Sequence, residues 1–168
     1  LAEAYLAAGN QVIIAGRRQA ALDAAKAAHP GLAAYVLDVA DPAAITPFAA
    51  MVTAAHPALN VVINNAGIMR AEDMLSSSDY LGDAEATVAT NLLGPIRMTA
   101  ALLPHLQRQP RAQIINVTSG LAFVPLALTP TYSATKAALH SSTQSLRHQL
   151  RSTGLEVLDL APPQVHSD

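Results

Sequence analysis

One tyrosine and one lysine have a spacing that could carry proton chemistry. Tyr132 and Lys136 are four positions apart at the start of a predicted helix, so their side chains share one face. A tyrosine hydroxyl has a pKa of about 10 and exchanges protons poorly at neutral pH, but a nearby ammonium stabilises the phenolate. The helix N-terminus adds a field that favours negative charge. The pair is suited to passing a proton to or from a substrate oxygen, although this spacing is common by chance.

Other polar residues that could complete such a site directly follow predicted strands. Ser119 lies thirteen positions before Tyr132, and its hydroxyl could donate a hydrogen bond to a carbonyl or a developing alkoxide. Polar residues also follow three other strands: Arg17 and Arg18, Asp38, and Asn64 with Asn65. Ligands bind at the carboxyl ends of the strands in open α/β sheets, so we expect all of these groups at one sheet edge.

Short apolar segments alternate with longer alanine-rich segments, and this alternation predicts the fold. Strands are expected over 11–15, 33–39, 59–63, 113–117 and 155–160, and helices over 1–8, 19–29, 41–55, 84–108 and 133–152. Pro95 is expected to bend the first half of the helix over 84–108. The helix over 41–55 begins with Asp41 at the N-cap and Pro42 at the first helical position. Without hairpin signals, the strands should pair in parallel, and their apolar character predicts burial on both faces. We expect an α/β fold: a doubly wound parallel sheet, Rossmann-like, in three α/β/α layers.

Composition narrows the class of protein. The 168 residues are 51% hydrophobic and 13% charged, which argues against disorder. A net charge of −2 and an aromatic content of 4% without tryptophan indicate no nucleic-acid partner. The absence of cysteine excludes disulfides and thiolate metal sites. The six histidines lack ligand spacing with carboxylates, so we expect no metal.

The sequence has neither a run of about 20 apolar residues nor a visible signal peptide. We therefore expect no membrane partner and a cytoplasmic location.

Together, the candidate residues resemble the short-chain dehydrogenase/reductase family in order, spacing and context, over essentially the whole chain. The family's motif residues match Asn64-Asn65-Ala66-Gly67 after a strand, Asn91 in a helix, Ser119, and Tyr132 with Lys136. The resemblance implies reversible hydride transfer between a nicotinamide cofactor and a carbonyl/alcohol pair. Tyr132 would be the acid/base, and Ser119 would orient the substrate oxygen. Lys136 would stabilise the phenolate and hydrogen-bond the nicotinamide ribose, and Asn91 would hold a water that links Lys136 to solvent.

The resemblance also implies cofactor contacts. Asn64, Asn65, Ala66 and Gly67 would brace the central strand and line the adenosine side. Asp38, followed by Val39, resembles the position that binds the adenine amino group. The segment 162–167 resembles the family's Pro-Gly segment near the nicotinamide, with Pro163 in place of the usual glycine and Ser167 in place of threonine. The backbone of Val165 would reach the carboxamide.

Two arginines favour NADP over NAD. An NAD site usually has an acidic residue at the end of the second strand, where it binds the ribose 2′-hydroxyl. The corresponding strand here is followed by Arg17 and Arg18, whose guanidinium groups could bind a 2′-phosphate. The alternative is that one of them caps the next helix or points into water.

The chain is expected to be one NAD(P)-binding domain over 1–168. It begins inside a helix and stops after a strand, so it looks truncated, without the first strand and its glycine-rich turn and without the C-terminal substrate lid. In the family, helices corresponding to 84–108 and 133–152 form the subunit interface. This implies a homodimer or homotetramer, although the same helix faces could pack on the sheet.

Two other functions stay open. Tyr-x-x-x-Lys sites also serve epimerases and dehydratases of nucleotide sugars, but the motif at 64–67 and Asn91 favour a simple reductase. A catalytically silent NADP-binding regulator would keep the fold, and the presence of Ser119, Tyr132 and Lys136 argues against it. Apolar residues at Leu121, Phe123, Val124 and Leu126 weakly favour a lipophilic carbonyl.

Overall fold

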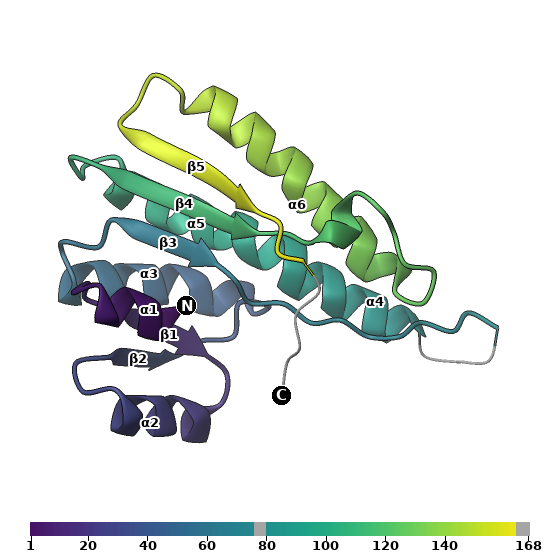
Figure 1. Cartoon of the computed structure of the whole chain (residues 1–168), viewed down its shortest axis with the longest axis horizontal. Coiled ribbons are helices and arrows are strands. Elements are labelled where there is room, and N and C mark those ends of the chain that lie inside the picture. The colour runs from purple at the N-terminus through teal and green to yellow at the C-terminus, as the bar shows by residue number, and fades with distance from the viewer. Residues whose placement is uncertain (76–79, 164–168) are drawn as a thin grey trace. The chain divides into compact units, whose positions relative to one another are not determined.

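The computed structural model describes residues 1–75 and 80–163 and contains two sheets, each made of parallel strands (Figure 1). The two-stranded sheet belongs to the unit Leu1–Val39, and the three-stranded sheet belongs to the unit Ala40–Asp168. All the strand pairs of both sheets are parallel, and helices flank them, which confirms the predicted α/β class. A single domain over 1–168 stays a prediction.

The first unit alternates helices and strands as predicted. Helix α1 ends before Gly9, whose φ of +83° lies in the left-handed region that glycine adopts without steric cost. Strand β1 pairs with β2 from Ile13↔Ala33 to Gly16↔Val36, so the carboxyl ends of both strands lie side by side. The unit consists of α1 (Ala2–Ala7), β1 (Ile13–Gly16), α2 (Gln19–Ala28) and β2 (Ala33–Val36).

The second unit contains the larger sheet. Its strand order is β3-β4-β5, with bounds Val61–Asn64, Ala112–Val117 and Leu155–Leu160. The register aligns Asn64 with Asn116 and Asn116 with Asp159, so polar residues meet at the carboxyl ends of the three strands. Helix α3 (Pro42–Ala55) begins as predicted, with the Asp41 carboxylate accepting a hydrogen bond from the Ala43 amide at 2.9 Å.

The helix predicted over 84–108 is wrong in its start and its continuity. It consists of α4 (Tyr80–Val88), a π-helical turn η1 (Ala89–Leu93) and α5 (Gly94–Leu106). Pro95 has no N–H to donate to the carbonyl four residues earlier. The Gly94 amide bonds the Ala89 carbonyl five residues back, which makes the turn π-helical.

Helix α6 spans Pro130–Gln149 and begins three residues before its predicted start. Proline fits the first helical turn, where its missing N–H would have no partner. Tyr132 therefore lies in the first turn of α6. Helices α5 and α6 pack on β3, β4 and β5 through fully buried side chains that include Leu102, Leu106, Ile114 and Leu139.

Burial of the strands on both faces is wrong for β5, and it is also wrong in the first unit, where Ala15 of β1 and Val36 of β2 are exposed. Leu155 and Val157 are buried, whereas Leu158 and Leu160 are 41% and 42% exposed. One face of β5 packs on α6 and the other does not. No helix in the described ranges is long and apolar enough to span a membrane.

Candidate active site

The predicted catalytic residues meet in the second unit, at the carboxyl end of β4 and the first turns of α6. Lys136 is the most buried charge among them, with 4% of its surface exposed. Its Nζ donates a hydrogen bond to the Val117 carbonyl at 2.7 Å, and no carboxylate within 1–75 or 80–163 forms an ion pair with it. Burial lowers the pKa of Lys136 below its usual value of 10.5. The fold therefore holds this ammonium at the carboxyl end of β4 without an ion pair to any described carboxylate.

Tyr132 lies beside this ammonium. The Lys136 Nζ is 5.6 Å from the centroid of the Tyr132 ring, which agrees with the shared helix face that their spacing predicts. Tyr132 is half-buried, and its hydroxyl forms no hydrogen bond to any other described residue. The Lys136 charge would stabilise a phenolate at this position.

Asn91 joins the segment after β3 to this site. It is fully buried in η1, where its Nδ2 donates to the Ile68 carbonyl and its Oδ1 accepts from the Ile68 amide, both at 2.8 Å. A Cβ built on Gly67 would lie 3.5 Å from Asn91 Oδ1 and 3.6 Å from Lys136 Nζ. A side chain at position 67 would therefore contact both groups. The Asn91 side chain thus fixes the backbone of Ile68 through two hydrogen bonds. Its role in a water relay stays a prediction.

Ser119 lies two residues after the end of β4 and occupies the N-cap of a short 3₁₀ turn, η2 (Gly120–Ala122). Its Oγ accepts a hydrogen bond from the Leu121 amide at 3.1 Å. Because this bond uses a lone pair, the hydroxyl hydrogen stays free to donate to a substrate oxygen.

A buried polar network braces β3 and β4 behind the site. Asn64 Nδ2 donates to Asn116 Oδ1, and Asn116 Nδ2 donates to Thr143 Oγ1, both at 2.8 Å. Thr143 Oγ1 donates in turn to the Leu139 carbonyl at 2.7 Å. Sequence reasoning found Asn64 but missed Asn116 and Thr143. The available signal was an asparagine inside an otherwise apolar strand, since a buried amide requires partners.

The candidate cofactor residues of the first unit follow its two strands. Arg17 and Arg18 are exposed after β1, and Arg18 sits at the N-cap of α2 without capping the helix through its side chain. Asp38 and Val39 are half-buried after β2. Val165 and Ser167 lie outside the described residues.

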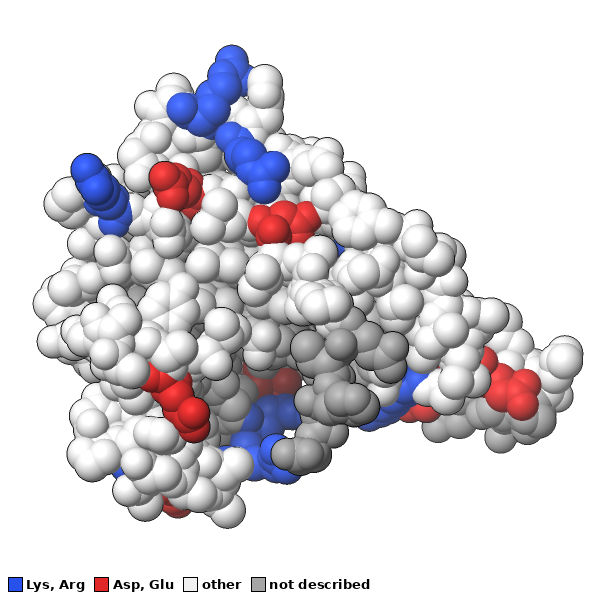
Figure 2. All heavy atoms as spheres, viewed as in Figure 1, with Lys and Arg blue, Asp and Glu red and all other residues white. Residues whose placement is uncertain are grey.

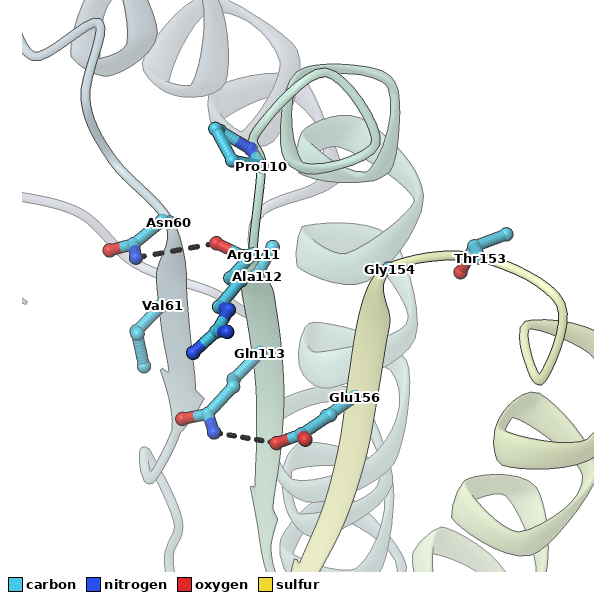
Figure 3. Close-up of a pocket in the computed structure, with 9 residues that line it drawn as sticks. All are labelled: Asn60, Val61, Pro110, Arg111, Ala112, Gln113, Thr153, Gly154 and Glu156. Atoms are coloured by element: carbon cyan, nitrogen blue, oxygen red, sulfur yellow. Dashed lines mark hydrogen bonds between the residues drawn. The ribbon is translucent and has the colours of Figure 1, made fainter.

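A pocket of about 800 Å³ in the second unit lies at the amino ends of its three strands, at the opposite end from Ser119 (Figure 3). Its side chains include Asn60, Gln113 and Glu156, and Gln113 Nε2 donates to Glu156 Oε2 at 2.8 Å. On the face drawn in Figure 2, acidic and basic side chains are scattered among uncharged ones without a broad basic surface. Among the described residues, no cluster of three metal-ligating side chains is present.

Comparison with known proteins assigns the chain to a family. The short chain dehydrogenase family matches residues 1–168. The chain is 44% identical over 165 residues to the uncharacterized oxidoreductase DltE of Bacillus subtilis, covering 98% of the chain and 66% of that protein. It is 32% identical over 163 residues to the NADP-dependent 3-hydroxy acid dehydrogenase YdfG of Salmonella typhi, covering 96% of the chain and 65% of that protein.

A solved structure shows the same fold. The closed form of serine dehydrogenase complexed with NADP⁺ superposes with a TM-score of 0.90 at 32% identity, over 98% of this chain and 66% of the other. The chain thus spans about two thirds of the length of these relatives. The family match over residues 1–168 shows that the chain belongs to the short-chain dehydrogenase/reductase family of oxidoreductases.

Proposed function

We propose that this protein transfers a hydride reversibly between NADP(H) and a carbonyl/alcohol substrate, with Tyr132 as the general acid/base. The observation that carries the proposal is the Lys136 ammonium, which is 4% exposed and lies 5.6 Å from the Tyr132 ring centroid. A buried cation without a counter-ion costs folding free energy. A role for that charge at the substrate oxygen would explain why the chain carries it.

The side chains divide the work as follows. The Tyr132 hydroxyl gives its proton to the substrate oxygen, and the Lys136 ammonium stabilises the phenolate that remains. The Ser119 hydroxyl donates to the same oxygen and holds it beside Tyr132. Asn91 keeps the backbone of Ile68 fixed through two hydrogen bonds at 2.8 Å and so fixes the segment that follows β3.

The residues fit a nicotinamide cofactor, which when bound supplies or accepts the hydride. The Lys136 ammonium can donate to ribose hydroxyls, and the exposed backbone after β3 leaves room for a ligand at Asn65 to Gly67. We propose that Arg17 and Arg18 bind the 2′-phosphate and that Asp38 and Val39 contact the adenine. Both arginines are exposed and neither forms an ion pair within the described part of the chain.

Relatives support the cofactor and narrow the substrate. One is named as an NADP-dependent 3-hydroxy acid dehydrogenase, and another was solved as a serine dehydrogenase complexed with NADP⁺. We therefore expect NADP rather than NAD. Hydroxy acids and their oxo counterparts are the first substrates to test, followed by lipophilic ketones and aldehydes.

The direct experiment is an assay of the full-length protein for NADPH oxidation over a panel of carbonyl compounds and for NADP⁺ reduction over a panel of alcohols. We expect turnover with at least one compound. A protein that binds NADPH but turns over nothing would favour the silent regulator. Conversion of a nucleotide sugar without net cofactor change would favour the epimerase or dehydratase.

The arginines give a separate test of cofactor choice. Removing both (Arg17→Ala with Arg18→Ala) should lower kcat/KM for NADPH by about 100-fold, because each guanidinium that binds a phosphate contributes a charge-assisted hydrogen bond. The kcat/KM for NADH should change little. Equal losses with both cofactors would show that the arginines do not select the 2′-phosphate. A cytoplasmic location and a homodimer or homotetramer through 84–108 and 133–152 are also proposed.

A further inference from the structure

A cluster at the carboxyl end of β5 is not used by the chemistry above. The side chain of Asp159 is only 11% exposed, and both of its carboxylate oxygens have partners. Oδ1 accepts from the Thr118 hydroxyl at 2.6 Å, and Oδ2 pairs with His140 Nδ1. The cluster thus connects β4, β5 and α6 through side chains alone.

Both ring nitrogens of His140 have partners. Nδ1–H donates to Asp159, which leaves Nε2 to accept from the Gln144 side-chain amide at 2.6 Å. His140 follows Lys136 by four residues and Tyr132 by eight, so the three side chains share one face of α6. Asp159 therefore holds α6 one turn beyond Lys136.

Asp159 and His140 contact the two ends of the segment that carries Ser119. At one end, the Thr118 hydroxyl bonds Asp159 directly before Ser119. At the other end, the Phe123 ring meets the His140 ring edge-on, with centroids 4.7 Å apart and planes at 70°. Between them, the Phe123 and Val124 amides bond the Gly120 carbonyl at 3.1 and 3.2 Å. The turn bearing Ser119 is thus closed on itself and fixed at both ends.

Strand pairing alone does not require this cluster. The ladder already aligns Asn116 with Asp159, and the Thr118 amide bonds the Leu160 carbonyl at 2.8 Å. A buried carboxylate that loses hydration costs free energy unless it gains such bonds, so an apolar pair would hold the register as well. What Asp159 adds is a connection from the sheet to α6 and to Phe123.

We propose that Asp159 is a positioning residue that acts through Thr118 and His140. It holds Ser119 and Phe123 in place relative to Tyr132, so that the substrate oxygen meets both hydroxyls while Phe123 forms an apolar side of the substrate site. The role in turnover rests on the proposed function, whereas the ordering of the segment from Thr118 to Val124 does not.

The experiment compares Asp159→Ala with Glu156→Ala in the full-length protein. Glu156 is a matched control because it also bonds a β4 side chain, Gln113, at 2.8 Å, but at the amino end of the strands. In Asp159→Ala, hydrogen exchange of the peptide 118–124 should accelerate by about tenfold, as for the loss of one hydrogen bond. Exchange at 113–116 should stay unchanged, and Glu156→Ala should match wild type in the peptide 118–124. Unaltered exchange of 118–124 in Asp159→Ala would overturn the proposal.

Turnover supplies the second readout. With a substrate found for wild type, Asp159→Ala should lower kcat by about 10- to 100-fold, as expected for misplaced reacting groups, with the NADPH dissociation constant unchanged. Asp159→Glu, which keeps both acceptors, should recover part of that loss. A wild-type kcat in Asp159→Ala would also overturn the proposal. If wild type turned over nothing, the proposed function would fail, while the exchange measurement would still decide the role of Asp159.

Discussion

The two ends of the sheet β3-β4-β5 differ in the burial of their polar side chains, and this difference distinguishes the candidate active site from the pocket. The amino end has the pocket of about 800 Å³ (Figure 3), but Asn60 and Glu156 in its lining are exposed and Gln113 is only half-buried. The carboxyl end buries Asn91, Asn116 and Lys136 at 0%, 4% and 4% exposure, each with hydrogen-bond partners. Burying polar side chains costs folding free energy, whereas a surface pocket does not require that cost. The buried polar side chains at the carboxyl end therefore indicate a functional site better than the volume of the pocket at the amino end does.

The sharpest way to break this comparison is to remove the charge at the carboxyl end. Lys136→Met keeps the side-chain volume and should lower kcat/KM by at least about 100-fold, because the phenolate loses its stabilising cation. The unfolding free energy should stay within about 1 kcal/mol of wild type, since the lost bond to Val117 is offset by the removed desolvation cost. Kinetics with urea unfolding would check both results. At the amino end, Gln113→Met should leave turnover at the wild-type level.

The buried network gives the next largest effect, on stability. Asn116→Ala leaves the Asn64 amide without its partner at 2.8 Å and deprives Thr143 of a donor, so we expect a loss of about 2–4 kcal/mol. On the same strand, Gln113→Ala should change the unfolding free energy by less than about 0.5 kcal/mol because its partner is exposed. Urea midpoints of the two variants would measure the contrast, and equal losses would contradict it.

The pH dependence of stability is the smallest expected effect. Burial lowers the pKa of Lys136 in the folded chain, whereas the unfolded chain keeps the usual value of 10.5. Between these two pKa values the unfolded chain binds more protons, so the contribution of Lys136 to the unfolding free energy rises with pH. The destabilisation of the folded chain by the buried Lys136 ammonium is fully present below the folded-state pKa. The stability of Lys136→Met relative to wild type should therefore fall as pH rises through that window, and a constant difference would contradict the burial of the charge.

Local sequence signals predicted much of this arrangement. The apolar runs, the Asp41-Pro42 start of α3 and the shared face of Tyr132 and Lys136 all depend on residues close together in the chain. The π-helical turn at Asn91 was not predicted, because proline indicates an interruption without saying how the helix adjusts.

Contacts distant in sequence were also missed. Asp159, His140 and Thr118 are unremarkable one by one, and only the sheet and α6 bring them together. Asn116 stood alone in an apolar strand, and its partners Asn64 and Thr143 come from other elements.

The most direct measurement is single-turnover hydride transfer with NADPH and an identified carbonyl substrate, in wild type, Tyr132→Phe and Glu156→Gln. The change to phenylalanine removes one hydroxyl and leaves the ring beside Lys136. We predict that Tyr132→Phe binds NADPH as wild type does but transfers hydride at least about 100-fold more slowly, while Glu156→Gln at the other end of the sheet keeps the wild-type rate. A wild-type rate in Tyr132→Phe would contradict the assignment of proton transfer to Tyr132.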